Sequence, residues 1–106
     1  MANLEEMVSF LNETLKTSEI PDYPGAHNGL QLENAGRVGK VVSAVDASLP
    51  VFEKAVKAGA DLLVVHHGMF WQGVRPISGP LYQKLKLAMD AGLAVYSSHL
   101  PLDIHD

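Results

Sequence analysis

The sequence predicts an α/β fold with a mostly parallel sheet and flanking helices, built from β-α-β crossover units and preceded by an N-terminal amphipathic helix. Short apolar runs alternate with helical patterns, and the helical patterns end at glycines. Two of these units repeat the same features 33 residues apart, an Ala-Gly pair before a strand and a histidine at the strand's end. At 106 residues, with 47% hydrophobic and 19% charged residues, the chain has the size and composition of one α/β domain, residues 1–106.

The first predicted element is the N-terminal helix. Asn3 and Glu6 have the spacing of a capping box. The apolar residues that follow recur at helical spacing: Leu4, Met7, Val8, Leu11 and Leu15. Residues 20–39 are rich in proline and glycine, so they predict a long connection with a short extended piece around Leu30 to Leu32.

The remaining elements alternate regularly, which is typical of crossovers in a parallel sheet. Ser48 and Pro50 are suited to the N-cap and first turn of a helix, and Gly59 and Gly92 are suited to helix C-termini. We predict strands over 40–47, 62–65 and 93–96, with helices over about 48–59 and 78–92 between them.

Charge and composition exclude several classes of function. Eight Lys and Arg against twelve Asp and Glu give a net charge of −4 without a basic run, so we expect no nucleic-acid partner. The sequence has no cysteine, which leaves histidines and carboxylates as the strong metal ligands. Glu5 and Glu6 stand where a secretory signal would be basic, and no apolar run approaches membrane-spanning length. We therefore expect a cytoplasmic protein with no membrane partner and, since so short a chain has a small core, a homo-oligomer.

Unusual polar residues follow the predicted strands at their carboxyl ends, where open parallel sheets bind ligands. Asp46 follows the first of these strands, His66 and His67 follow the second, and His99 and Asp103 follow the third. Neighbouring strands lie about 4.8 Å apart, so these groups can converge despite their separation in sequence. The pattern predicts a metal site, and imidazole with carboxylate favours Zn, Mn, Fe, Co or Ni over Ca.

The adjacent histidines His66 and His67 can share one site only if the predicted strand 62–65 ends before them. Successive strand side chains point to opposite faces, so we expect His66 and His67 to reach one cluster only if the strand has already ended. Gly68 would then permit a turn that directs them toward two neighbouring ions. The alternative is that both are exposed loop histidines without a special role.

Other residues have two interpretations. Asp46 either caps the following helix, which we favour, or accepts a hydrogen bond from a metal-bound imidazole. Asn28 either reaches over the pocket or forms an Asn-Gly turn. The Met-Phe-Trp segment 69–71 either walls a pocket, forms an oligomer interface or covers the sheet, and His27 and His105 are expected to be solvated. Nucleotide-binding glycine loops of the two common types are absent from the sequence.

Three segments resemble the N-terminal half of the Nif-three-like dinuclear-metal-centre proteins, also called type-two GTP cyclohydrolase I homologues. They are 60–67 (ADLLVVHH), 98–103 (SHLPLD) and 27–31 (HNGLQ), which match in order and spacing. The resemblance implies that His66, His67 and Asp103 are metal ligands. It places His99 beside the metals as a ligand, an orienting partner or a catalytic proton-transfer group. It further implies toroidal homo-oligomers and a hydrolase-like activity on a small-molecule substrate.

This sequence departs from that family in one respect. Members complete the site with another histidine and a glutamate near the C-terminus of a longer chain, and no His-x-x-x-Glu pattern occurs here. We expect a fragment, a truncated gene product or a reduced variant that takes ligands from another subunit. The sequence thus predicts a divalent-metal-binding, hydrolase-like protein with a partial dinuclear site. The alternative is a non-catalytic oligomeric or partner-binding domain that has lost the complete site.

Overall fold

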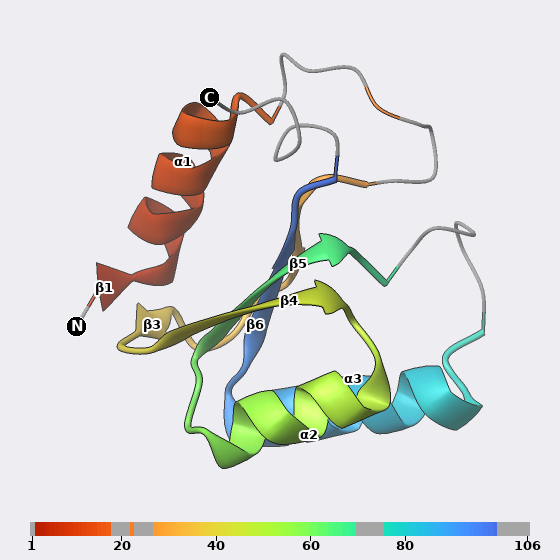
Figure 1. Cartoon of the computed structure of the whole chain (residues 1–106). Coiled ribbons are helices and arrows are strands. Elements are labelled where there is room, and N and C mark those ends of the chain that lie inside the picture. Colours follow the sequence, from red (N-terminus) through yellow and green to blue (C-terminus); the bar gives the residue numbers. More distant parts are fainter. Residues whose placement is uncertain (1, 18–21, 23–26, 70–75, 100–106) are drawn as a thin grey trace.

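The computed structural model describes residues 2–17, 22, 27–69 and 76–99 (Figure 1). Within this part of the chain the fold is mixed α/β, as predicted, and has three helices. In chain order the elements are β1 (Ala2–Asn3), α1 (Leu4–Leu15), β2 (Gly29–Leu32), β3 (Arg37–Val38), β4 (Val41–Asp46), α2 (Leu49–Lys57), β5 (Leu62–His67), α3 (Gly79–Ala91) and β6 (Ala94–Ser97).

The central sheet has four strands in the order β2-β6-β5-β4. β5 pairs in parallel with both β4 and β6, which confirms the predicted crossovers, while β2 joins the edge antiparallel to β6. In the register, Val65 lies opposite Ser97 and His67 lies opposite Asp46. β1 and β3 form a separate two-stranded antiparallel sheet.

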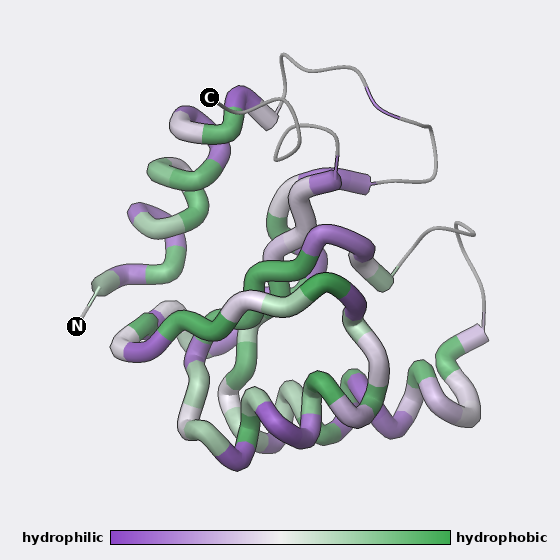
Figure 2. Tube along the Cα trace, in the orientation of Figure 1, coloured by the Kyte–Doolittle hydropathy of each residue, from purple (hydrophilic) through white to green (hydrophobic). Residues whose placement is uncertain are grey.

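The sheet is covered on both faces, and successive side chains of its strands pack against opposite covers (Figure 1). Leu63 and Val65 face α2 and α3, where they pack in one cluster with Phe52 of α2. Leu62 and Tyr96 belong to a second cluster beneath α1. Figure 2 shows the resulting apolar centre of the sheet. Burial on both faces is the reason that β5 has a continuous apolar run rather than an alternating one.

The ends of the helices are determined locally. The Asn3 side chain accepts hydrogen bonds from the backbone N–H groups of Glu5 and Glu6, as its part in a capping box requires. Ser48 caps α2, because its Oγ accepts from the backbone N–H of Val51 at 3.4 Å. The preference for Asp46 as the cap is therefore wrong, and Asp46 is instead the last residue of β4.

Among the described residues, no helix is both long and apolar enough to cross a bilayer.

Candidate metal centre

Three histidines meet at the carboxyl end of the parallel strands. His66 and His67 are the last two residues of β5, and His99 follows β6. Their ring centroids are 4.7 Å apart for His66 and His67, 4.5 Å for His66 and His99, and 5.4 Å for His67 and His99. One ring nitrogen from each histidine lies within 4.8 Å of the other two, which is a cluster that can hold a metal ion.

The two adjacent histidines converge for a reason that differs from the prediction. We expected the strand to end before them, but β5 continues through His67, which pairs with Asp46 of β4. On its other side, pairing with β6 ends at Val65 and Ser97. His66 and His67 therefore extend past the end of β6, where the sheet no longer separates its two faces, and both rings reach the same space.

Gly68 also has a different role from the predicted one. Its φ is not among the positive values of the described glycines, so it does not provide a left-handed turn. A Cβ at this position would instead lie 2.5 Å from Gln31 Nε2, 2.6 Å from Gln31 Oε1 and 2.7 Å from Ser97 Oγ. Glycine is favoured here because the side chains of Gln31 in β2 and Ser97 in β6 lie close to the chain directly after the histidine pair.

Asp46 holds the imidazole of His67. Its Oδ1 lies 2.8 Å from Nδ1 of His67, and both side chains are substantially exposed, at 64% for Asp46 and 43% for His67. Of the two interpretations of Asp46, the structure supports that of a hydrogen-bond acceptor for an imidazole. A histidine that donates from Nδ1 to a carboxylate keeps the lone pair on Nε2, the arrangement common in histidines that bind metal.

His99 has a buried counterpart of this arrangement. Its Nδ1 lies 3.2 Å from Oδ1 of Asp22, whose side chain is only 6% exposed. Asn28 connects the two residues, because its Nδ2 donates to Asp22 at 2.9 Å and its Oδ1 accepts from the backbone N–H of His99 at 2.8 Å. Asn28 thus reaches the site, as one of its two interpretations proposed.

Asp22 is the residue of the site that sequence reasoning missed. It lies in the proline-rich connection, far from any strand end. In the sequence, Asp22 is marked only by its position six residues before the Asn28-Gly29 pair, which is a weak indication of a functional role.

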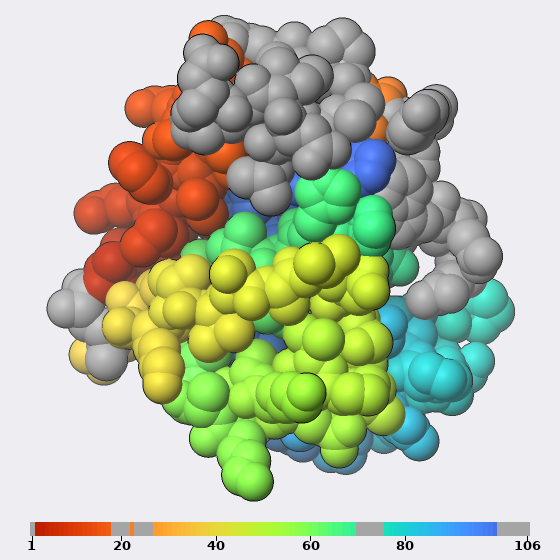
Figure 3. All heavy atoms as spheres, viewed as in Figure 1, coloured from red at the N-terminus to blue at the C-terminus, as the bar shows by residue number. Residues whose placement is uncertain are grey.

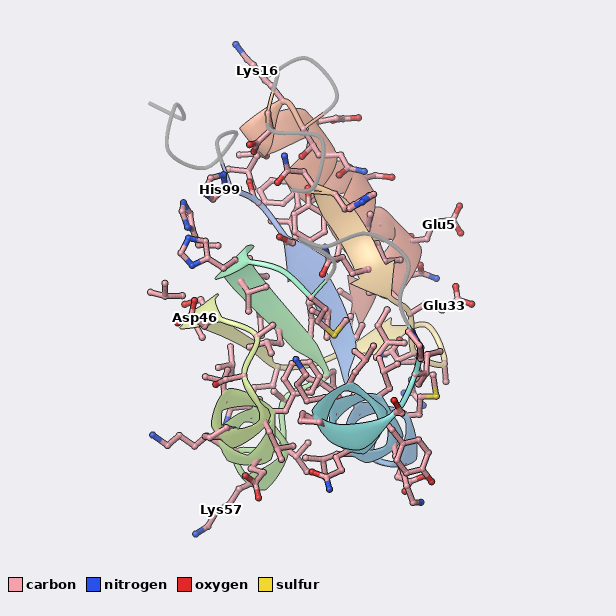
Figure 4. The ribbon with its side chains drawn as sticks, turned by 90° about the vertical axis from the view of Figure 1, so that its right-hand side faces the viewer. Glu5, Lys16, Glu33, Asp46, Lys57 and His99 are labelled. Carbon is pink, nitrogen blue, oxygen red and sulfur yellow. The ribbon has the colours of Figure 1, made fainter. Side chains whose placement is uncertain are left out.

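Figure 4 shows His99 and Asp46 at the same end of the strands, away from Glu5 and Glu33. In the space-filling view the ends of β5, in green, and of β6, in blue, reach the surface side by side (Figure 3). The three imidazoles thus form the candidate site together with the carboxylates of Asp22 and Asp46.

Several predicted residues lie elsewhere. Asp103 and His105 are outside the described residues, as is all of segment 69–71 except Met69. Met69 is buried in the cluster under α2 and α3, and its backbone N–H donates to Gln31, so it covers the sheet. His27 is exposed, as expected for a solvated loop histidine.

The donor set fits a transition metal. Imidazole nitrogens with carboxylate partners suit Zn, Mn, Fe, Co or Ni and do not suit Ca, which requires oxygen ligands. At the same end of β6, the Oγ atoms of Ser97 and Ser98 are fully buried and have no hydrogen-bond partner among the described residues. Buried polar atoms without a partner are uncommon in folded proteins.

Fold and site together define a mixed α/β protein with a histidine cluster at the carboxyl end of a parallel sheet. The model of one protein family, described as Duf34/NIF3 (NGG1p interacting factor 3), matches residues 2–106. The chain belongs to this family, which confirms the resemblance noted in the sequence.

Relatives and solved structures agree with this assignment. A protein from Pyrococcus horikoshii named "GTP cyclohydrolase 1 type 2 homolog" is 45% identical over 101 residues, which are 95% of this chain and 40% of the relative. A protein of the same name from Escherichia coli K12 is 43% identical over 94% of this chain and 40% of its own length. The crystal structure of TTHA1606 from Thermus thermophilus superposes with a TM-score of 0.92 at 39% identity, covering 97% of this chain and 42% of that one. The chain thus spans about two fifths of the length of these proteins.

Proposed function

We propose that this chain binds a divalent transition metal ion through His66, His67 and Asp103, with His99 beside them, and contributes this site to a hydrolase-like protein. The observation that carries the proposal is the convergence of three imidazoles, with one nitrogen each within 4.8 Å of the others. The names of the relatives agree with hydrolytic chemistry on a small-molecule substrate of the GTP class.

The residues of such a site would have different roles. Asp46 and Asp22 lie at Nδ1 of His67 and His99, which favours the tautomer in which Nε2 of each ring carries the lone pair that a cation needs. His99 was open as a ligand, an orienting partner or a proton-transfer group, and its place in the cluster supports the ligand role. Asp103 would add a carboxylate ligand to the imidazole ligands.

When bound, a divalent metal supplies a Lewis acid that polarises a carbonyl, phosphoryl or ring carbon and activates water near neutral pH. The protein's part is to fix the rings and to limit the approach of solvent. His99, whose side chain is 14% exposed, is better shielded for this than His67 at 43%. If His99 is not a ligand, it is the residue placed to move a proton.

The complete centre extends beyond this chain in our proposal. We propose two ions per site, with the further histidine and glutamate coming from another subunit or from sequence that the longer relatives have. A cytoplasmic homo-oligomer is the assembly that would bring such ligands together, without nucleic acid or membrane as a partner. Metal content would then depend on the oligomer as well as on these residues.

Metal content tests the proposal directly. The full chain, purified without a chelating tag, should contain stoichiometric transition metal by elemental analysis. His66→Ala and Asp103→Ala should each lose most of it while the far-UV circular dichroism spectrum is unchanged. His27→Asn is the matched control, because His27 is an exposed histidine with φ 47° and asparagine tolerates that conformation. Full metal content in both site variants would refute the assignment of ligands.

A non-catalytic oligomeric or partner-binding domain is the alternative. It predicts a stable oligomer by light scattering and no turnover of GTP, phosphoesters or amides even in saturating metal. Hydrolysis that disappears in His99→Ala would exclude this alternative.

A further inference from the structure

We infer that Asp22 and Asn28 form a clamp that sets the tautomer and direction of the His99 ring, and so act as positioning residues for the site. The inference rests on the proposed function for its metal-binding consequence. Its structural part concerns only the hydrogen bonds of these three residues.

The clamp is a closed ring of three hydrogen bonds. The backbone N–H of His99 donates to Asn28 Oδ1 at 2.8 Å, Asn28 Nδ2 donates to Asp22 Oδ2 at 2.9 Å, and Nδ1 of His99 lies 3.2 Å from Asp22 Oδ1. The ring therefore holds both the backbone and the imidazole of His99. Its two supporting residues come from the connection before β2, more than 70 positions away in sequence.

The bonding pattern allows one assignment of donors and acceptors. The backbone N–H of His99 can only donate, so Asn28 must direct its oxygen toward it and its NH₂ toward Asp22. An ionised Asp22 only accepts, so the proton of a neutral His99 ring must be on Nδ1. Nε2 then carries the lone pair that a cation would bind.

Burial makes this clamp stiffer than the equivalent contact at His67. The Asp22 side chain is 6% exposed and that of His99 is 14% exposed, whereas Asp46 and His67 are open to solvent. Water competes less for a buried hydrogen bond, and a buried carboxylate without partners is costly. Loss of the Asp22 carboxylate should therefore disturb the site more than loss of the Asp46 carboxylate.

Exchanging the two side chains provides the test. In Asp22→Asn, a single amide oxygen replaces two acceptors, so either the proton on Nδ1 or the amide of Asn28 loses its partner. In Asn28→Asp, two carboxylates face each other. In the double variant Asp22→Asn/Asn28→Asp, the new amide donates to the new carboxylate and accepts from Nδ1, and the carboxylate accepts from the backbone N–H. All three hydrogen bonds are restored, and the negative charge moves from the acceptor of Nδ1 to the acceptor of the backbone N–H.

Two measurements on the full chain separate the clamp from the proposed function. Long-range ¹H–¹⁵N NMR of the metal-free protein, at a pH where the histidines are neutral, reports the tautomer of His99. We expect the Nδ1–H form in the wild type and the double variant, and a mixture or the Nε2–H form in Asp22→Asn. Titration with Zn²⁺ alone should show an affinity about 10- to 100-fold lower for Asp22→Asn, a smaller loss for Asp46→Asn and recovery in the double variant.

The outcomes are distinct. An Nε2–H tautomer in the wild type, or the same tautomer in wild type and Asp22→Asn, would overturn the clamp. Failure of the double variant to restore the tautomer would also overturn it, because hydrogen-bond complementarity would not then be what orients the ring. If the wild type shows the expected tautomers but binds no Zn²⁺, the clamp stands and the proposed function fails. Should Asp22→Asn lose its circular dichroism spectrum, the folded double variant still decides the result.

Discussion

Gly68→Ala is the substitution whose effect can be worked out most directly from the structure. The new Cβ would lie 2.5 and 2.6 Å from the two amide atoms of Gln31 and 2.7 Å from Ser97 Oγ. Gln31 has to move, although its Nε2 donates to the carbonyl of His27 and its Oε1 accepts from the backbone N–H of Met69. Ser97 is fully buried in β6 and has little room to retreat.

The magnitude combines three effects. Two hydrogen bonds of Gln31 are worth about 0.5–1.5 kcal/mol each, and overpacking adds about 1–3 kcal/mol. Lower entropy of the unfolded chain returns about 0.4–1 kcal/mol, because φ at Gly68 is not left-handed. We expect a net loss of about 1–6 kcal/mol in the free energy of unfolding, measured by urea denaturation followed by circular dichroism.

Gln31→Ala provides the matched background. It removes two of the three close contacts, so Gly68→Ala should cost clearly less there than in the wild type, and the double-mutant cycle gives the difference. A cost below about 0.5 kcal/mol in the wild-type background would mean that β2 and β6 do not confine this position.

Two further predictions concern the support of the sheet. Burial raises the pKa of the Tyr96 phenol, partly offset by its hydrogen bond with Thr17, so the folded protein keeps this proton at a pH where the unfolded chain loses it. The free energy of unfolding should therefore not depend on this group below its ordinary pKa of 10.0, and it should fall as the pH rises above that value. When urea midpoints are compared across alkaline pH, the fall should be shallower in Tyr96→Phe. The two N–H groups of Asn34 Nδ2 are shared among three backbone carbonyls, which lie at 3.2, 3.1 and 2.9 Å in segments far apart in sequence. Asn34→Asp replaces that donor with an acceptor and should cost roughly 2–4 kcal/mol in urea denaturation, whereas a neutral result would show that these carbonyls find other donors.

The succession of strands and helices could be predicted because its signals are local. Ser48 and Pro50 favour the start of a helix independently of the tertiary structure, and Gly92 ends a helix with φ 70°. The position of β2 could not be predicted, because its antiparallel pairing with β6 depends on how the connection before it returns to the sheet.

The candidate site was predictable only where a strand end indicated it. His66, His67 and His99 follow apolar runs, so topology alone brings them together. The contacts that orient them depend on tertiary structure: Asp46 bonds His67 because β4 and β5 are in register, which sequence alone does not determine. Asp22 reaches His99 through a connection that has no periodicity to interpret.

One consequence concerns α1, the helix that packs on the second face of the sheet. α1 packs over Leu62 and Tyr96. Asn12 of α1 and Thr17 just beyond its end both form hydrogen bonds with the Tyr96 hydroxyl. Deletion of the first 17 residues would expose the apolar side chains on this face of the sheet and would remove Asn12 and Thr17, the hydrogen-bond partners of the Tyr96 hydroxyl. We expect the shortened protein to aggregate on expression, although its sequence retains every histidine of the cluster.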